Sequence, residues 1–180
     1  MISDANAFLS WFNGVHRRTV RDISLLPPEA ATWLPNAPTE GDERWGIPKL
    51  VAHIAEGRGF FAGAFRGDGW VWDLWPAELP DRDSWIAALE ASLDVLRTAV
   101  SSASPDRLAA KIPAIDQPDQ LLAGWRVLMM MAEHEVAHRA QIGTYAGLNG
   151  WPVAQIFDRT NEWVVAQRDA QLERRGRAPE

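Results

Sequence analysis

The sequence predicts an all-α fold, an antiparallel four-helix bundle with an additional helix at the C-terminal end. Three observations indicate this class. Apolar residues recur at the spacing of one helix face along five long segments. Connectors that contain proline or glycine separate these segments. The apolar–polar alternation that is typical of strands is almost absent.

The first two helices are expected on either side of a loop rich in proline, asparagine and glycine. The first runs from about residue 3 to residue 25 and is stopped by Pro27-Pro28. The second begins at Pro48, a favourable first-turn residue, and reaches about Phe65, where Gly67-Asp68-Gly69 ends it. The predicted buried side of the first helix consists of Phe8, Trp11, Phe12, Val15 and Ile23.

Three further helices follow. The third is capped by Asp83-Ser84 and ends near Ser102. The fourth is the most apolar and spans about residues 119 to 147, and the fifth begins at Pro152 and ends near Glu173. The side chains expected to face inward are Trp85, Leu89, Leu93 and Leu96 in the third helix, and Ile156, Phe157, Thr160, Trp163 and Val164 in the fifth.

Length and composition indicate a single globular domain over residues 1–180, with a core at about 3–150 and the C-terminal helix at about 152–173. The chain has 180 residues, of which 47% are apolar and 23% charged. A substantial core is therefore possible and disorder is disfavoured. The net charge of −6 disfavours nucleic acid as a partner, because an acidic surface repels phosphate groups.

Neither a signal peptide nor a membrane span is expected. The start Met1-Ile2-Ser3-Asp4 lacks a basic region followed by an apolar run, and no apolar run approaches the roughly 18 residues that span a bilayer. We therefore expect a cytoplasmic protein without a membrane partner. Because the chain has no cysteine, a bound metal would take histidine, carboxylate or water as ligands.

Two histidines in the fourth helix carry the functional prediction. His134 and His138 are four residues apart, which places both imidazoles on one face of a helix, close enough to share an ion. They share that face with apolar residues, so we expect them to point inward. The intervening Glu135 also completes an H-E-x-x-H pattern, which is typical of zinc peptidases.

A third ligand is expected from the second helix. His53 lies within an inward stripe of that helix, and Gly57, one turn later, offers free volume beside it. A lone histidine on an apolar face is more often a hydrogen-bonded core residue, but an inward pair one turn away favours a metal. Three inward histidines from two helices would leave open positions for water or a small-molecule substrate. His16, beside Arg17-Arg18, is assigned to the surface, and the run of three methionines at 129–131 to core filling.

The sequence resembles the DinB/YfiT-like family of metalloenzymes. The likeness is carried by Leu50-Val51-Ala52-His53-Ile54-Ala55-Glu56 and by His134-Glu135-Val136-Ala137-His138-Arg139-Ala140-Gln141-Ile142. The second segment matches the family pattern H-x-x-x-H-R-G-Q-I except that Ala140 replaces the glycine. The resemblance covers roughly residues 7 to 150.

This resemblance implies a four-helix bundle in which His53, His134 and His138 bind a divalent ion, often zinc or nickel. It implies that the protein is an enzyme such as a thiol-dependent S-transferase, using a low-molecular-weight thiol, or a hydrolase. Homodimers are common in the family.

Four further residues are candidates for supporting roles. Glu135 is a candidate base or outer partner of the site, with a salt bridge to an arginine such as Arg139 as the alternative. Glu56, one turn from His53, could orient that imidazole, and a solvent-facing role is equally compatible with the sequence. Gln141 and Tyr145 lie on the histidine face and could line the pocket. Trp70, Trp72 and Trp75 could cover its mouth, although ordinary packing is the preferred interpretation.

Two other functions remain open. A zinc peptidase would use Glu135 as its base and needs a third ligand downstream, for which Glu162 is a candidate; its place on the fifth helix, however, faces solvent. A non-catalytic helical module would hold a structural ion or none. Structural sites are normally closed by four protein ligands, and no fourth candidate is evident.

Overall fold

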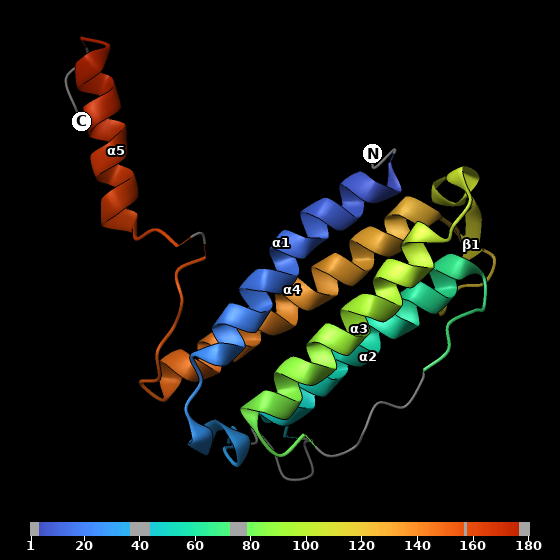
Figure 1. The fold of residues 1–180 in the computed structure, drawn as a ribbon, viewed down its shortest axis with the longest axis horizontal. Helices are drawn as coiled ribbons and strands as arrows, with labels where there is room; N and C mark the ends of the chain where they lie inside the picture. Colours follow the sequence, from blue (N-terminus) through green and yellow to red (C-terminus); the bar gives the residue numbers. More distant parts are fainter. Residues whose placement is uncertain (1–3, 37–43, 73–78, 157, 177–180) are drawn as a thin grey trace.

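Four helices lie side by side in the computed structural model, which describes residues 4–36, 44–72, 79–156 and 158–176 (Figure 1). Helices α1 and α4 run in one direction and α2 and α3 in the other. The helices are α1 (Ala5–Ser24), α2 (Ile47–Arg66), α3 (Arg82–Ser101) and α4 (Gly124–Leu148). The predicted helical bundle is therefore confirmed.

Local capping chemistry fixes where these helices begin and end. The Asp4 side chain accepts from the Ala7 amide at the start of α1. Asp81 and Ser84 form a capping box at the start of α3, so the predicted cap at Asp83-Ser84 was two residues late. Gly67 ends α2 with φ of 109°, a conformation that glycine adopts without steric strain.

A small hairpin precedes α4, which the sequence did not predict. Strands β1 (Lys111–Pro113) and β2 (Leu121–Ala123) pair antiparallel, with Ile112 opposite Leu122. Residues 119–123 therefore do not belong to the fourth helix, which begins at Gly124. Two short 3-10 helices, η1 (Pro28–Ala31) and η2 (Pro105–Leu108), complete the connections.

The core consists of two hydrophobic clusters, to which all four helices α1 to α4 contribute. On α1 the buried positions follow one stripe through Phe8, Phe12 and Val15 to Ile23. Trp11, which we expected on this stripe, is 48% exposed. The prediction was wrong because residue 11 lies about 100° around the helix from Phe12.

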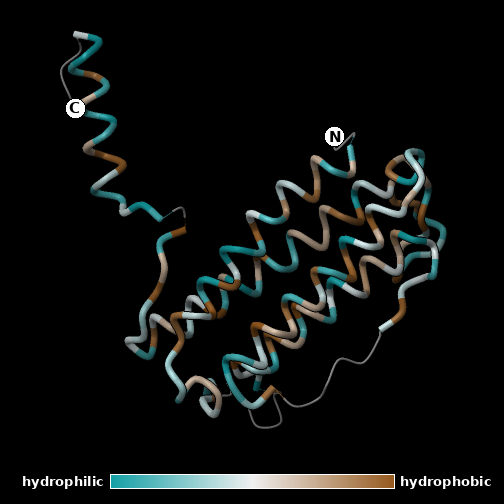
Figure 2. The backbone as a smooth tube through the Cα atoms, viewed as in Figure 1, coloured by the Kyte–Doolittle hydropathy of each residue, from teal (hydrophilic) through white to brown (hydrophobic). Residues whose placement is uncertain are grey.

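Helix α5 (Asn161–Arg174) stands apart from the bundle (Figure 1). It begins nine residues later than predicted and contains no buried residue, and its tube is largely hydrophilic (Figure 2). Of the side chains expected to face inward, Phe157 lies outside the described residues, and Ile156, Thr160, Trp163 and Val164 are exposed. An apolar stripe this short does not specify packing. No described helix is long and apolar enough to cross a membrane.

Candidate metal centre

Three histidines converge between α2 and α4. His53 comes from α2, and His134 and His138 come from successive turns of α4. One side-chain nitrogen of each lies within 4.8 Å of those of the other two. The ring centroids are 4.5 to 4.9 Å apart, and Nε2 of His134 lies 2.9 Å from Nε2 of His53. The geometry expected from the sequence is therefore present.

These nitrogens fit a shared ion. Two imidazole nitrogens that bind one ion tetrahedrally at about 2.0–2.1 Å are roughly 3.3 Å apart. The separation of 2.9 Å between His53 and His134 is within about half an ångström of that value. Without an ion, two Nε2 atoms this close form a hydrogen bond when one imidazole donates from Nε2 and the other, in the opposite tautomer, accepts. Three imidazoles suit zinc, nickel and other divalent transition ions.

A hydrogen-bonded chain sets the orientation of His138. Its Nδ1 lies 3.1 Å from Oε1 of Gln141, whose amide nitrogen donates to the Tyr145 hydroxyl at 2.9 Å. Gln141 therefore presents an acceptor to His138, which donates from Nδ1 and keeps the lone pair of Nε2 for a metal. On the other helix, Oε2 of Glu56 lies 4.0 Å from Nδ1 of His53.

Gly57 makes room for His134. A Cβ atom at position 57 would lie 2.7 Å from Cε1 and 2.9 Å from Nδ1 of His134. Both distances are too short for non-bonded atoms, so any larger residue displaces the imidazole. The free volume expected beside His53 is thus occupied by the ring of His134.

The imidazoles of His53 and His134 are held neutral by their surroundings. Burial, followed by the charges of His138 and His53, lowers the pKa of His134 to about 4. Burial, followed by His138 and Lys49, also lowers the pKa of His53 from its usual 6.5. Both side chains are therefore unprotonated at pH 7, which is the state that a metal ion requires.

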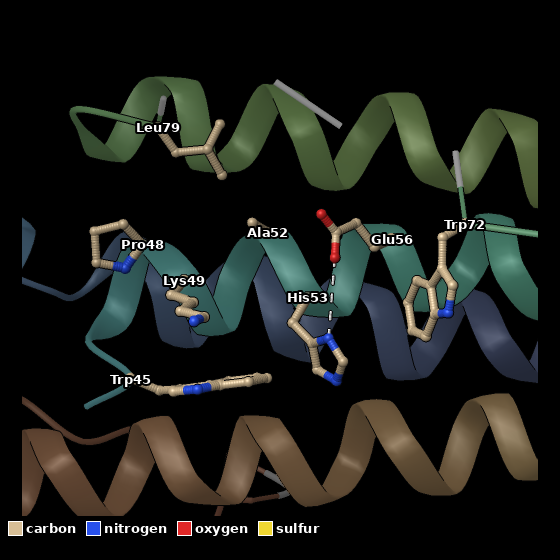
Figure 3. A pocket seen from close by; sticks show the side chains of 8 residues that line it. All are labelled: Trp45, Pro48, Lys49, Ala52, His53, Glu56, Trp72 and Leu79. Atoms are coloured by element: carbon tan, nitrogen blue, oxygen red, sulfur yellow. Dashed lines mark ion pairs between the residues drawn. The ribbon is translucent and has the colours of Figure 1, made fainter. Parts of the chain in front are cut away.

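An open cleft of about 590 Å³ leads to His53. Figure 3 shows His53 pointing from α2 towards α4, with Trp45 on one side and Trp72 on the other. The Trp45 ring meets that of His53 edge-on at 4.9 Å, and Trp72 stacks on it at 5.9 Å. Lys49 also lines the cleft, with Nζ 4.7 Å from the Trp45 ring centroid. The sequence analysis missed both Trp45 and Lys49. Nothing in the sequence places the loop that carries Trp45 beside α4, whereas Lys49 lies on α2 one turn before His53, so its spacing could have identified it.

Two of the three tryptophans after α2 lie within the described residues, whereas Trp75 lies outside them. Trp70 packs on Phe60 and Phe61 and donates from Nε1 to the carbonyl of Pro113. Trp72 is 48% exposed and lines the cleft, and its ring also stacks on Phe60 at 4.2 Å. Ordinary packing, which we preferred, therefore describes Trp70, while Trp72 combines packing with a place at the cleft.

Glu135 has a different partner from the one expected. Its side chain is 1% exposed, and both carboxylate oxygens accept from Arg58, at 2.8 and 2.9 Å. Thr19 donates to Oε1 as well, at 2.6 Å. Burial alone would raise the pKa of Glu135, but the charge and hydrogen bonds of Arg58 lower it. Arg139, the expected partner, instead approaches Asp22 at 3.6 Å.

His16 is not a surface residue, as we had expected. It is 4% exposed, and its Nε2 lies 3.1 Å from Oε1 of Glu90. Burial and the nearby charge of Arg58 lower its pKa. The prediction was wrong because the adjacent Arg17-Arg18 belongs to the outer part of α1, while residue 16 follows the buried Val15. In the methionine run, Met131 is buried in the core, as expected.

Known proteins share this architecture. The structure is similar to that of a DinB-like protein from Bacillus subtilis, with a TM-score of 0.65 and 14% identity over 86% of this chain and 99% of that one. It is also similar to the mycothiol-dependent maleylpyruvate isomerase, with a TM-score of 0.58 and 14% identity over 94% of this chain and 69% of that one. A histidine-to-alanine mutant of that enzyme matches with a TM-score of 0.56 and 13% identity over the same shares.

No curated protein matches the chain. The model of the DinB superfamily, however, matches residues 12–142, which is more than half of the chain and includes the three histidines. The protein therefore belongs to the DinB superfamily.

Proposed function

We propose that the protein is a divalent-metal-dependent enzyme whose ion, zinc or nickel, is held by His53, His134 and His138. The observation that carries this proposal is the convergence of three imidazole nitrogens within 4.8 Å of one another beside an open cleft. Three neutral ligands leave the charge of the ion uncompensated and leave positions for a reactant. An ion held there supplies a Lewis acid that lowers the pKa of a thiol or water.

The side chains around the histidines have separate tasks in this proposal. Gln141, supported by Tyr145, holds His138 in the tautomer that exposes Nε2. Glu56, whose Oε2 lies 4.0 Å from Nδ1 of His53, acts on that imidazole through its charge. Trp45 and Trp72 form apolar walls that exclude water from the reacting atoms. Lys49 adds positive charge to the cleft, which favours an anionic thiolate or substrate.

A low-molecular-weight thiol is the proposed second reactant, as in a thiol-dependent S-transferase. The structural likeness to a mycothiol-dependent isomerase supports this choice. The attacking sulfur would have to come from such a thiol, because the chain has no cysteine. A hydrolase, in which water replaces the thiol at the same position, is the nearest alternative.

Metal analysis and thiol titration test the proposal. The purified protein should contain about one divalent ion per chain, and His53→Ala should bind it much more weakly while the far-ultraviolet circular dichroism stays unchanged. Addition of mycothiol or bacillithiol to the Co²⁺-loaded protein should produce a sulfur-to-cobalt charge-transfer band. A bound ion whose spectrum no thiol or substrate changes would favour a non-catalytic metal-binding module.

Two observations disfavour a zinc peptidase. Both oxygens of Glu135, the base in that mechanism, are engaged by Arg58. Glu162, its candidate third ligand, is exposed on α5, which stands apart from the bundle (Figure 1). Variants of Glu162 should keep the metal content of the wild type.

A homodimer, a cytoplasmic location and the absence of nucleic-acid binding stay predictions. The exposed apolar side chains of Trp163 and Val164 on α5 offer a surface that a second copy of the chain could contact. Light scattering after size-exclusion chromatography would test the dimer by its mass.

A further inference from the structure

A buried ion pair joins the two helices that carry the histidines. Arg58 directly follows Gly57, the residue against which His134 packs, and Glu135 directly follows His134. The side chain of Arg58 is fully buried and that of Glu135 is 1% exposed. On each helix, the pair therefore lies one residue from the place where Gly57 and His134 pack together.

The pair is anchored to all four helices of the bundle. Arg58 donates from Nε and Nη2 to the two oxygens of Glu135 on α4, and from Nη1 to the Leu89 carbonyl and the Ser92 hydroxyl on α3. Thr19 on α1 donates to the same carboxylate. Any sliding or rotation of α4 against α2 strains these directional bonds together.

Apolar packing does not provide the same constraint. The hydrophobic contribution depends on the area buried and has no preferred direction, so small shifts between helices change it little. A bidentate guanidinium–carboxylate pair fixes both the distance between the two groups and the orientation of their planes. A metal site needs such a constraint, because ligand distances must hold to within about 0.2 Å.

We propose that Arg58 and Glu135 are positioning residues, which set the register of α4 against α2 and thereby hold His134 and His138 at ligand distance from His53. This inference rests on the proposed metal site. It assigns the glutamate of the H-E-x-x-H pattern to the framework of the site rather than to proton transfer. The ion pair orients the histidines by fixing the position of α4 against α2, and it contacts neither the ion nor the reactants.

The test replaces both members of the pair by apolar residues of similar volume, as Arg58→Met with Glu135→Leu. Replacing an entire buried pair in this way often preserves folding, whereas removing one partner leaves an unpaired buried charge. Zn²⁺ affinity is measured by competition with a chromophoric chelator, and the ligand field by the visible spectrum of bound Co²⁺. We expect a folded double variant with at least tenfold weaker Zn²⁺ binding and an altered Co²⁺ spectrum.

The matched control is Leu96→Ala, which weakens the core on α3 without removing a hydrogen bond of the pair. It should lose stability but keep wild-type Zn²⁺ affinity and Co²⁺ spectrum. If Leu96→Ala weakens Zn²⁺ binding as much as the double variant does, general loss of stability explains the effect and the positioning role is overturned.

Two further outcomes separate this inference from the proposed function. A wild-type protein that binds neither Zn²⁺ nor Co²⁺ overturns both. A wild type that binds them, together with a folded double variant of unchanged affinity and spectrum, overturns the positioning role alone. If the double variant does not fold, Arg58→Lys replaces it. This variant keeps the charge but not the bidentate geometry, so it should bind Zn²⁺ more weakly than wild type, and unchanged binding overturns the inference.

Discussion

Two polar clusters share helices α2 and α4, and they differ in how their polar groups are matched. In the first, Arg58 and Glu135 meet as donor and acceptor, with Thr19 and Ser92 completing the set. In the second, Nε2 of His53 faces Nε2 of His134, and burial together with the charge of His138 lowers the pKa of both imidazoles. The first cluster matches opposite charges within the protein, whereas the second gathers three like ligands around a point where an ion can bind.

This contrast separates a determinant of the fold from a site for a ligand. A buried charged pair with matched partners is stable only while both members are present. A cluster of imidazoles that can bind an ion lowers the stability of the folded protein, as functional sites commonly do. Substitution of one member of the ion pair should therefore cost much more stability than substitution of a histidine, whereas both kinds of variant should weaken metal binding.

The largest effect on stability is expected from breaking the ion pair. Glu135→Ala leaves the Arg58 guanidinium buried without a counter-charge, which should lower the free energy of unfolding by about 3–5 kcal/mol. Urea denaturation of the metal-free protein measures it. His53→Ala should change the same quantity by less than about 1 kcal/mol. Equal losses in the two variants would contradict the distinction between the clusters.

The stability of the metal-free protein should also depend on pH through His134. The folded-state pKa of His134 is lowered from 6.5 to about 4, so the unfolded chain takes up a proton that the folded chain refuses. The free energy of unfolding should be unaffected above pH 6.5 and should fall as the pH drops from 6.5 towards 4, by up to about 3 kcal/mol. Urea denaturation of the wild type and of His134→Gln at several pH values measures the contribution of His134 to the pH dependence. If the variant showed the same pH dependence as the wild type, this prediction would be contradicted.

Gly57→Ala should weaken the metal centre without unfolding α2. Alanine favours a helix more than glycine does, but its Cβ would displace the His134 ring. We expect Zn²⁺ affinity to fall at least about tenfold, equivalent to roughly 1.4 kcal/mol. Calorimetric titration measures the affinity. Gly143→Ala is the matched control, since a Cβ there meets nothing within 4 Å, and a similar loss in both variants would argue against a specific clash.

Gln141→Leu removes the acceptor from His138 while keeping a similar volume. Loss of such an outer partner typically weakens metal binding by about 10- to 100-fold, and we expect the lower end because His138 can bond to water instead. Chelator competition measures the change. An affinity equal to that of wild type would show that the Gln141–Tyr145 chain does not orient His138.

The smallest effect is expected from removing residues 161–180. Helix α5 contains no buried residue, so the free energy of unfolding should change by less than about 0.5 kcal/mol. Thermal and urea denaturation at low protein concentration measure it. A larger loss would mean that α5 packs against the bundle or against a second copy in solution.

Much of the fold was predictable because the bundle follows from periodicity. The helix spacing of His134 and His138, and the place of His53 on an inward stripe, are local properties of the sequence. The hairpin before α4 was missed because strands of three residues are too short to show alternation. Helix α5 was misjudged because its few apolar side chains match helical spacing without having a surface to cover.

The surroundings of the site could be predicted only in part. Gln141 and Tyr145 share a helix face with His138, so spacing identifies them. Arg58 could not be found in this way, because an arginine in an apolar helix becomes interpretable only once its counter-charge on a distant segment is known. Lys49 lies on α2 four residues before His53, so spacing could have identified it, whereas Trp45 reaches the cleft through the path of a loop, which no periodicity encodes.

The central claim is that three imidazoles share one ion, and X-ray absorption spectroscopy of the zinc-loaded protein tests it most directly. The account predicts three imidazole ligands at about 2.0–2.1 Å in the wild type and two in His53→Ala. A zinc ion with fewer than three imidazole ligands, or a spectrum that His53→Ala leaves unchanged, would contradict it.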